Sequence, residues 1–222
     1  MLEVIWLTLK LATITVVVLL VLGTPLAWWL SRTRSVFKAP LEAITALPLV
    51  LPPTVLGFYL LLAMGEGGPL GRFWQHLFDS PLSFTFAGLV VASCVYSLPF
   101  VVQPLQAVFE KLEANAIEAA WTLGASRWRT FVTVIMPQAR SGFMTASVLG
   151  FAHTLGEFGV VLMVGGSIPG ETRVMSIAIY EYVETLQFDL AHKLSLLLLG
   201  FSFVVLWLVY AINRGRQVAK WT

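Results

Sequence analysis

The sequence predicts an all-α membrane protein with five transmembrane helices in a single domain covering residues 1–222. Hydrophobic residues make up 58% of the chain and charged residues only 12%, and the mean hydropathy is +0.83, which is too apolar for a soluble domain of this size. The apolar runs, of roughly 20 residues each, are long enough to cross about 30 Å of hydrocarbon as helices. The short alternating segments typical of membrane barrels do not occur in the sequence.

The first expected span covers about residues 5–30. It is too long for the apolar core of a signal peptide, and no small-residue cleavage site precedes its basic flank, so we expect the span to be retained. Gly23, Thr24 and Pro25 interrupt it shortly before a tryptophan pair. A kink near the membrane interface is therefore expected.

The second span, at about 41–64, contains Pro48, Pro52 and Pro53. Each proline removes a backbone donor and disfavours helical geometry in the residue before it. A broken helix at membrane depth is tolerated where protein or water covers the exposed backbone, so Pro52 and Pro53 are candidate pathway residues. A plain proline kink in a packed helix is the alternative. A polar, glycine-rich loop is expected over 65–83.

The remaining spans are expected at about 84–109, 142–164 and 194–212. The fourth span is rich in glycine and alanine, small residues that let neighbouring membrane helices approach closely. Residues 165–193 are too charged to cross lipid, and we expect a short interfacial helix in the middle of this segment.

The basic residues predict the orientation. Ten of the 14 Lys and Arg residues fall in 31–40, in 110–141 and in the tail from 213 onward. With five spans these three segments lie on one side, which the positive-inside rule makes the cytoplasm, and the N-terminus then lies outside. An even number of spans would place the charges of the tail on the opposite side, so the distribution favours five.

The segment 110–141 is predicted to form a helix, a turn and a second helix. Asn115 precedes Glu118 by three residues, the spacing of a capping box, which predicts the start of the first helix. Gly124 can adopt the left-handed conformation that ends a helix. Ser126 is placed to cap the second helix.

The small residues Ala119, Ala120 and Gly124 would let another protein approach the backbone closely, which predicts a docking surface. Glu118-Ala119-Ala120, with Gly124 after three intervening residues and Ile135-Met136-Pro137 further on, resembles the EAA loop of ABC importer permeases, through which these permeases couple to a cytoplasmic ATPase. The alternative is that Glu118 only completes a capping box and the alanines are ordinary helix formers. The expected ATPase-coupling residues are Glu118, Ala119, Ala120, Leu123, Gly124, Ala125, Ile135 and Pro137.

Further stretches extend the resemblance over most of the chain. Residues 23–32 resemble the end of the first core helix in this permease family, and residues 154–159 and 168–173 resemble molybdate ABC transporter permeases. Related patterns occur in sulfate and tungstate permeases. Sulfate permeases tend to be longer and to use two different membrane subunits, so the short chain favours molybdate.

The resemblance implies a type I ABC importer permease core in a bacterial inner membrane. It implies a homodimer that pairs with two cytoplasmic ATPase subunits and receives an oxyanion from an external binding protein. The chain has no GxxxxGK[ST] phosphate loop, so we expect no cofactor on it and assign ATP and Mg to the partner ATPase. Closure of the ATPases would move the coupling helices and produce alternating access. No nucleic-acid partner is indicated, because excess Lys and Arg in membrane chains have a topological origin.

Glu157 is the most conspicuous charged residue in a span. A carboxylate at this depth must face the bundle interior or a pathway. Its position between Gly156 and Gly159 favours a gate or hinge, with the carboxylate bonded to backbone donors or to a basic residue such as Arg173; a structural glutamate is the alternative. His153, one turn earlier, is expected to be an interior histidine, and no metal site is expected because no second His or Cys lies nearby.

Arg173 is a candidate for the mouth of the pathway, because a guanidinium group suits a tetrahedral oxyanion. The alternative is an ordinary ion pair with Glu171 or Glu181. Two other classes of protein stay open. A membrane enzyme would need catalytic groups in the spans, which offer only Glu157 and His153. A passive channel or a membrane anchor would need no ATP.

Overall fold

The computed structural model describes residues 1–218, and their regular structure is entirely helical, which confirms the all-α fold. The element η1 is a short 3-10 helix and η2 is a π-helix. In chain order the helices are α1 Leu2–Arg32, α2 Lys38–Ala46, η1 Leu47–Leu49, α3 Pro53–Met64, α4 Pro69–Phe78, α5 Phe86–Glu110, α6 Ala114–Thr122, α7 Arg127–Thr130, η2 Phe131–Ile135, α8 Met136–Gln138, α9 Arg140–Gly156, α10 Gly159–Gly165, α11 Met175–Glu184 and α12 Phe188–Val218.

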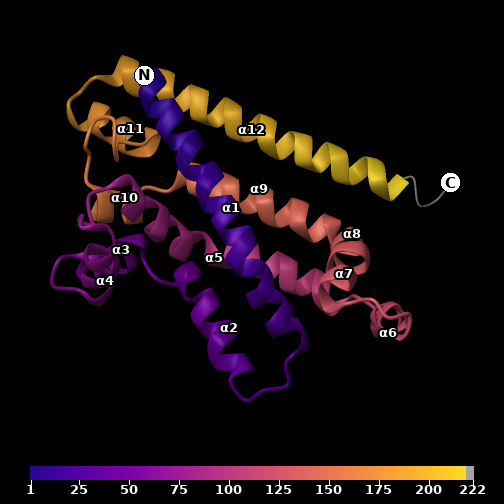
Figure 1. The fold of residues 1–222 in the computed structure, drawn as a ribbon. Coiled ribbons are helices and arrows are strands. Elements are labelled where there is room, and N and C mark those ends of the chain that lie inside the picture. Colours follow the sequence, from indigo (N-terminus) through magenta and orange to yellow (C-terminus); the bar gives the residue numbers. More distant parts are fainter. Residues whose placement is uncertain (219–222) are drawn as a thin grey trace.

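Three long helices, α1, α5 and α9, pack against one another at the centre of the bundle (Figure 1). α12 lies along α9 and α11, and α3 packs on α10. The core between α1, α5 and α9 includes the fully buried Leu30, Leu105 and Phe109. This core continues to the end of the bundle that carries α6 and α7, because Ile117 and Ile135 belong to the same cluster.

Among the residues that the structure describes, three helices are long and apolar enough to cross a membrane, namely α1, α5 and the part of α12 at Phe188–Trp207. Two further candidates are bent pairs: Lys38–Leu49 with Pro53–Met64, at 111°, and Arg140–Gly156 with Gly159–Gly165, at 63°. If each bent pair counts as one span, the structure has five spans. The basic tail residue Lys220 lies outside the described residues.

The second span is broken where the prolines lie. Its first half ends at Leu49, and α3 begins at Pro53, with Pro52 as the N-cap. A proline is tolerated in the first turn of a helix because the missing N–H would have had no partner there. α3 then crosses α10 closely, since a Cβ built on Gly57 would lie 2.8 Å from Cβ of Met163.

The loop expected over 65–83 contains a helix, so that prediction is wrong. α4 starts with Pro69 in its first turn and ends at Phe78, and its C-cap Asp79 has a left-handed φ of 52°. Its apolar side chains recur at helical spacing, a pattern present in the sequence. They are Leu70, Phe73, Trp74 and Leu77.

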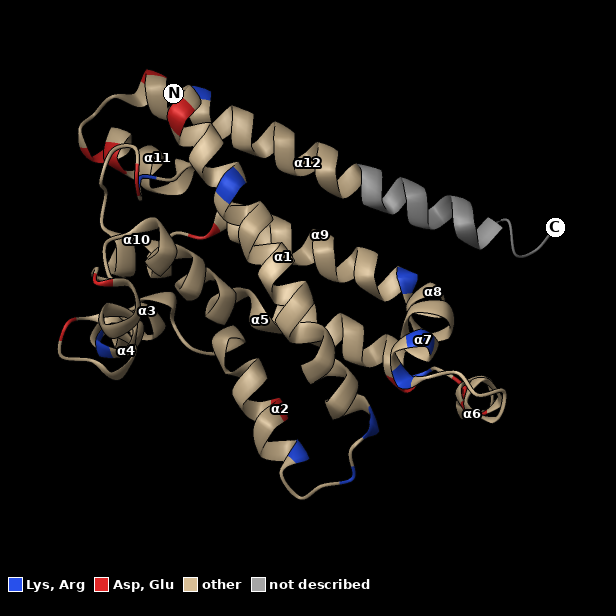
Figure 2. Ribbon diagram, viewed as in Figure 1, with Lys and Arg blue, Asp and Glu red and all other residues tan. Residues whose placement is uncertain are grey.

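The predicted interruption of the first span is wrong, because α1 continues as one helix through Pro25. The hydroxyl of Thr24 donates to the carbonyl of Leu20 on the same helix. α11 lies in the middle of the segment where a short helix was expected. Figure 2 shows several acidic residues around α11 and the loops beside α4, whereas many basic residues lie at the opposite end, around the turns next to α1, α2 and α7, together with a few acidic ones.

Candidate functional site

The turn after α6 has the geometry predicted for a docking elbow, a name we use for residues 113–130. Gly124 has a φ of +80°, in the left-handed region. Its N–H donates to the carbonyl of Trp121, and the N–H of Ala125 donates to the carbonyl of Ala120 at 3.0 Å. This pair of bonds is the Schellman arrangement that ends helices at glycine. The left-handed conformation at this position therefore favours glycine over any residue with a side chain.

The start of α6 differs from the prediction. The N-cap is Glu113, its side chain makes no capping hydrogen bond, and Asn115 lies inside the first turn. The prediction that Asn115 and Glu118 form a capping box is therefore wrong. The helix starts earlier because α5 ends only a few residues before Glu113, whose extended backbone already turns the chain into α6. Glu118 is left exposed, with no ion pair among the described residues.

One face of the elbow is anchored and the other is free. Ile117 and Ile135 are buried, at 5% and 4% exposure, in the core that also contains Phe109. On the free face, Leu123 is 88% exposed and Trp121 is 50% exposed. Exposed large apolar side chains on a polar segment are typical of a protein contact surface.

The second helix of the elbow is capped as predicted, because the hydroxyl of Ser126 accepts from the N–H of Arg129 at 3.2 Å. The chain then widens into the π-helix Phe131–Ile135, where the N–H of Met136 bonds to the carbonyl of Phe131. Pro137 follows directly and has no N–H to donate, so a local change in the bonding pattern is expected just before it.

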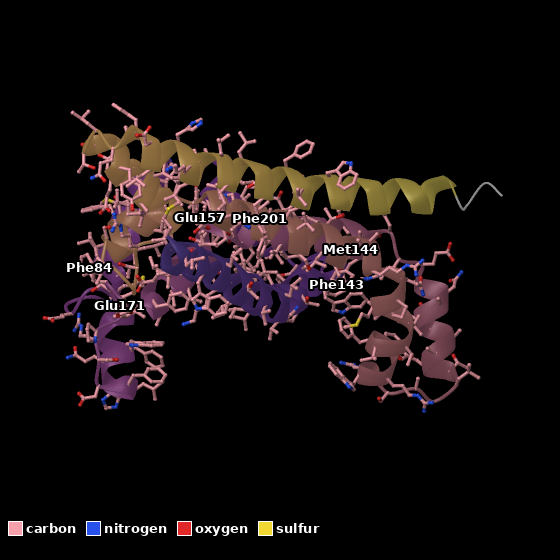
Figure 3. The ribbon with its side chains drawn as sticks, turned by 90° about the horizontal axis from the view of Figure 1, so that it is seen from above. Phe84, Phe143, Met144, Glu157, Glu171 and Phe201 are labelled. Carbon is pink, nitrogen blue, oxygen red and sulfur yellow. The ribbon has the colours of Figure 1, made fainter. Side chains whose placement is uncertain are left out.

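The second group of candidate residues lies at the break in the fourth span. Glu157 has an extended backbone between α9 and α10, and its side chain is 0% exposed. Its carboxylate accepts hydrogen bonds from the hydroxyls of Ser93, at 2.5 Å, and Ser97, at 2.6 Å, both on α5. Its backbone carbonyl accepts from the hydroxyl of Ser176 on α11. Figure 3 shows Glu157 inside the bundle, away from Phe143 and the elbow end.

His153 completes this network. Its Nδ1 lies 2.9 Å from Oγ of Ser97 and 3.4 Å from the carboxylate of Glu157. The ring stacks on Phe100 with centroids 3.9 Å apart and also contacts Tyr96. The expectation of an interior histidine is confirmed.

The prediction that Glu157 could pair with Arg173 is wrong. Arg173 forms an ion pair with Glu181 at 2.6 Å, and its guanidinium lies over the ring of Tyr182. Glu181 is on α11, directly after the loop that carries Arg173, whereas Glu157 already has its donors from α5. The alternative of an ordinary ion pair with Glu181 is therefore confirmed.

The breaks in the second and fourth spans meet at one cavity of about 520 Å³. A Cβ built on Gly159 would lie 2.9 Å from Cβ of Pro53, so α10 approaches the start of α3 closely. Pro52 is exposed beside this contact, whereas Arg173 does not line the cavity. The lining residues are Pro53, Thr54, Tyr96, Ala152, His153, Gly156, Glu157, Phe158 and Gly159.

Ser93, Ser97 and Tyr96 were not among the residues predicted for this site. The two serines are four residues apart in an apolar span, so they lie on one face of α5. This spacing indicated a polar stripe, but the sequence could not show that Glu157 lies opposite it.

A helical membrane bundle with broken spans and an exposed docking elbow is the architecture of a membrane transport subunit. The chain belongs to the family described as "Binding-protein-dependent transport system inner membrane component", which matches residues 10–218. It is a transport component and not an enzyme.

Several curated relatives match nearly the whole chain. The chain is 57% identical to the molybdenum transport system permease protein ModB of Azotobacter vinelandii, over 95% of this chain and 93% of that protein. It is 38% identical to ModB of Escherichia coli K12, over 81% of this chain and 78% of that protein. The sulfate transport system permease protein CysT of Synechocystis is 34% identical, over 90% of this chain and 70% of that protein.

Solved structures share the fold at low sequence identity. A chain of a bacterial ABC transporter involved in the import of the acidic polysaccharide alginate has a TM-score of 0.75 at 16% identity, over 96% of this chain and 78% of that chain. A chain of the MetNI methionine ABC transporter has a TM-score of 0.68 at 17% identity, over 96% of this chain and 94% of that chain. These structures establish the fold of an ABC importer permease.

Proposed function

We propose that this chain is the transmembrane permease subunit of an ATP-driven importer whose cargo is the oxyanion molybdate. The elbow at Gly124 supports the coupling role, because it presents Glu118 and Leu123 to a partner while Ile117 fixes it to the bundle. The cargo rests on one observation, the 57% identity to a molybdenum permease over nearly the full length. Sulfate permeases are more distant relatives, and sulfate or tungstate is the alternative cargo.

The proposed assembly is a homodimer with two ABC ATPase subunits and an external binding protein. Five helices can hardly enclose a polar path, whereas two symmetric copies can. Apolar side chains on and beside α2 and α3 are unusually exposed, including Phe37 at 66%, Val50 at 81% and Tyr59 at 62%. Their exposure supports a second copy or lipid against this side. ATP and Mg belong to the ATPase partner.

The proposed orientation places the elbow in the cytoplasm and the N-terminus outside. The basic residues near the elbow support it, since Arg32 at the end of α1 lines the same hollow as Arg127 of the elbow. Figure 2 shows further basic residues in the turn after α1 and around α7, at this end of the bundle. Positive residues concentrate on the cytoplasmic side of membrane proteins. The acidic residues around α11 then face the external binding protein.

The break at Glu157 is the proposed gate. Its carboxylate joins the end of α9 to α5 through Ser93 and Ser97, and the cavity beside it lies between the two broken spans. A half-helix held by a few side-chain bonds is suited to move when the elbow moves. The carboxylate is fully covered and bonded, which supports a positioning role instead of contact with the anion.

Uptake of labelled molybdate into vesicles containing the permease, the ATPase and the binding protein tests this function. We expect uptake to depend on ATP. We also expect tungstate to compete with molybdate more strongly than sulfate does. Competition by sulfate equal to that by molybdate would assign the chain to sulfate import. Uptake that continues unchanged without ATP would indicate a passive channel.

A further inference from the structure

Two hollows adjoin on the surface of the bundle, where α1 meets the elbow and the segment that follows it. Trp28 and Phe131 line both of them, so the hollows share a wall. The first, which we call the apolar hollow, has a volume of about 660 Å³ and is lined by Leu20, Val21, Thr24, Pro25, Trp28, Trp128, Phe131, Met136 and Phe143. The second, the arginine hollow, has a volume of about 400 Å³ and is lined by Trp28, Arg32, Ala114, Ile117, Glu118, Trp121, Arg127, Thr130, Phe131 and Ile135.

The apolar hollow offers no charge and little hydrogen bonding. The hydroxyl of Thr24 already donates to the carbonyl of Leu20, and the other side-chain donors on the wall are the two indole groups. Val21 and Trp128 are 66% and 74% exposed, so the hollow opens on the outside of the bundle. Because α1 is long and apolar enough to span a membrane, a membrane around α1 would surround this opening with hydrocarbon. The chemistry therefore suits an acyl chain.

The arginine hollow is positively charged on balance, with Arg32 and Arg127 against the single carboxylate of Glu118. Arg32 donates through Nη2 to the carbonyls of Phe109 and Leu112, both at 3.2 Å, which uses only part of its five N–H donors. Within residues 1–218 neither arginine forms an ion pair with a carboxylate. A guanidinium group with free donors matches the geometry of a phosphate.

The aromatic residues place the boundary between hydrocarbon and head groups at the junction of the two hollows. Tryptophan is enriched at membrane interfaces, and Trp28 and Trp128 lie on the walls here. The guanidinium of Arg32 lies 4.9 Å from the ring of Trp28, and Trp128 stacks on Phe131. The π-helix starts at Phe131, and such local widening is frequent at functional sites.

We propose that the two hollows together bind one anionic phospholipid, with an acyl chain in the apolar hollow and the phosphate between Arg32 and Arg127. A lipid in this position contacts α1 on one side, and the elbow with the helices that follow it on the other. It would therefore stabilise the packing of the elbow on the bundle. The proposal does not depend on the identity of the transported anion.

The test is native mass spectrometry of the full chain, with the subunits that copurify, from nanodiscs of equal parts phosphatidylglycerol and phosphatidylcholine. We expect the wild-type chain to retain one phosphatidylglycerol molecule in preference to phosphatidylcholine. Val21→Trp fills the apolar hollow and should remove this lipid. Val17→Trp is the matched control, since Val17 is 55% exposed on the same helix and lines neither hollow.

A second pair of variants tests the head-group site without adding bulk. Arg127→Gln should weaken retention of phosphatidylglycerol about tenfold, the loss expected for one charge-assisted hydrogen bond. Arg129→Gln, which changes an exposed arginine outside both hollows, should leave retention unchanged. Equal retention within each pair of variants, or equal retention of the two lipids, would overturn the proposal. Dissociation of a second copy of the chain by Val21→Trp, with an unchanged lipid count, would assign the hollow to a chain-chain contact and would also overturn it.

Discussion

Replacing Ser97 with alanine removes one of the bonds that hold the break in the fourth span. The Ser97 hydroxyl donates to the carboxylate of Glu157 at 2.6 Å, and both side chains are buried. A hydrogen bond to a charged group contributes about 1.5–3 kcal/mol in soluble proteins, whereas bonds between membrane helices average about 0.6 kcal/mol. Because Ser93 remains as a donor, we expect Ser97→Ala to lower the free energy of unfolding by about 1.5 kcal/mol.

The assay is a double-mutant cycle with Glu157→Gln, followed by denaturant unfolding of the purified chain in mixed micelles. If the two side chains share a bond, the double variant should lose about 1 kcal/mol less than the sum of the single losses. Ser147→Ala is the control, because the hydroxyl of Ser147 donates only to the carbonyl of Phe143 within α9, and it should change stability by less than about 0.5 kcal/mol. Additive losses at Ser97 and Glu157 would refute a shared hydrogen bond between these two side chains.

Three further predictions concern transport. Gly124→Val should abolish uptake and release the ATPase while the permease stays in the membrane, because Gly124 has a left-handed φ of +80°; membrane immunoblots and pull-downs measure this. Glu157→Gln should lower the uptake rate more than permease abundance, and an equal fall in both would favour a structural glutamate. Arg173→Ala should leave the KM for molybdate nearly unchanged, because Arg173 does not line the cavity. The variant should also change protein stability little, since a partly exposed ion pair such as that with Glu181 contributes about 0–1 kcal/mol.

Features that depend on neighbouring residues in the chain were predictable from the sequence. Gly124 and Ser126 occupy the turn and the cap that their types favour, and α3 starts where Pro52 and Pro53 exclude a continuous helix. Local backbone geometry decides each of these positions. The apolar character of the long helices likewise follows from composition alone.

Features that depend on distant residues were not predictable. Glu157 pairs with serines some 60 residues away on α5, and the sequence offered Arg173 as an equally reasonable partner. The start of α6 was misplaced because the end of α5 determines where the chain turns, so Glu113 takes the cap position and Asn115 does not. The helix α4 was missed because its glycines and polar residues suggested a loop, although its apolar residues have helical spacing.

We propose that the elbow is the contact through which a separate ATPase drives the permease. Photo-crosslinking in intact membranes from a reactive group at Leu123, which is 88% exposed on the elbow, tests it directly. We expect a crosslink to the nucleotide-binding subunit whose yield changes when ATP is added. A crosslink to lipid or to the external binding protein, with none to the ATPase, would contradict the account.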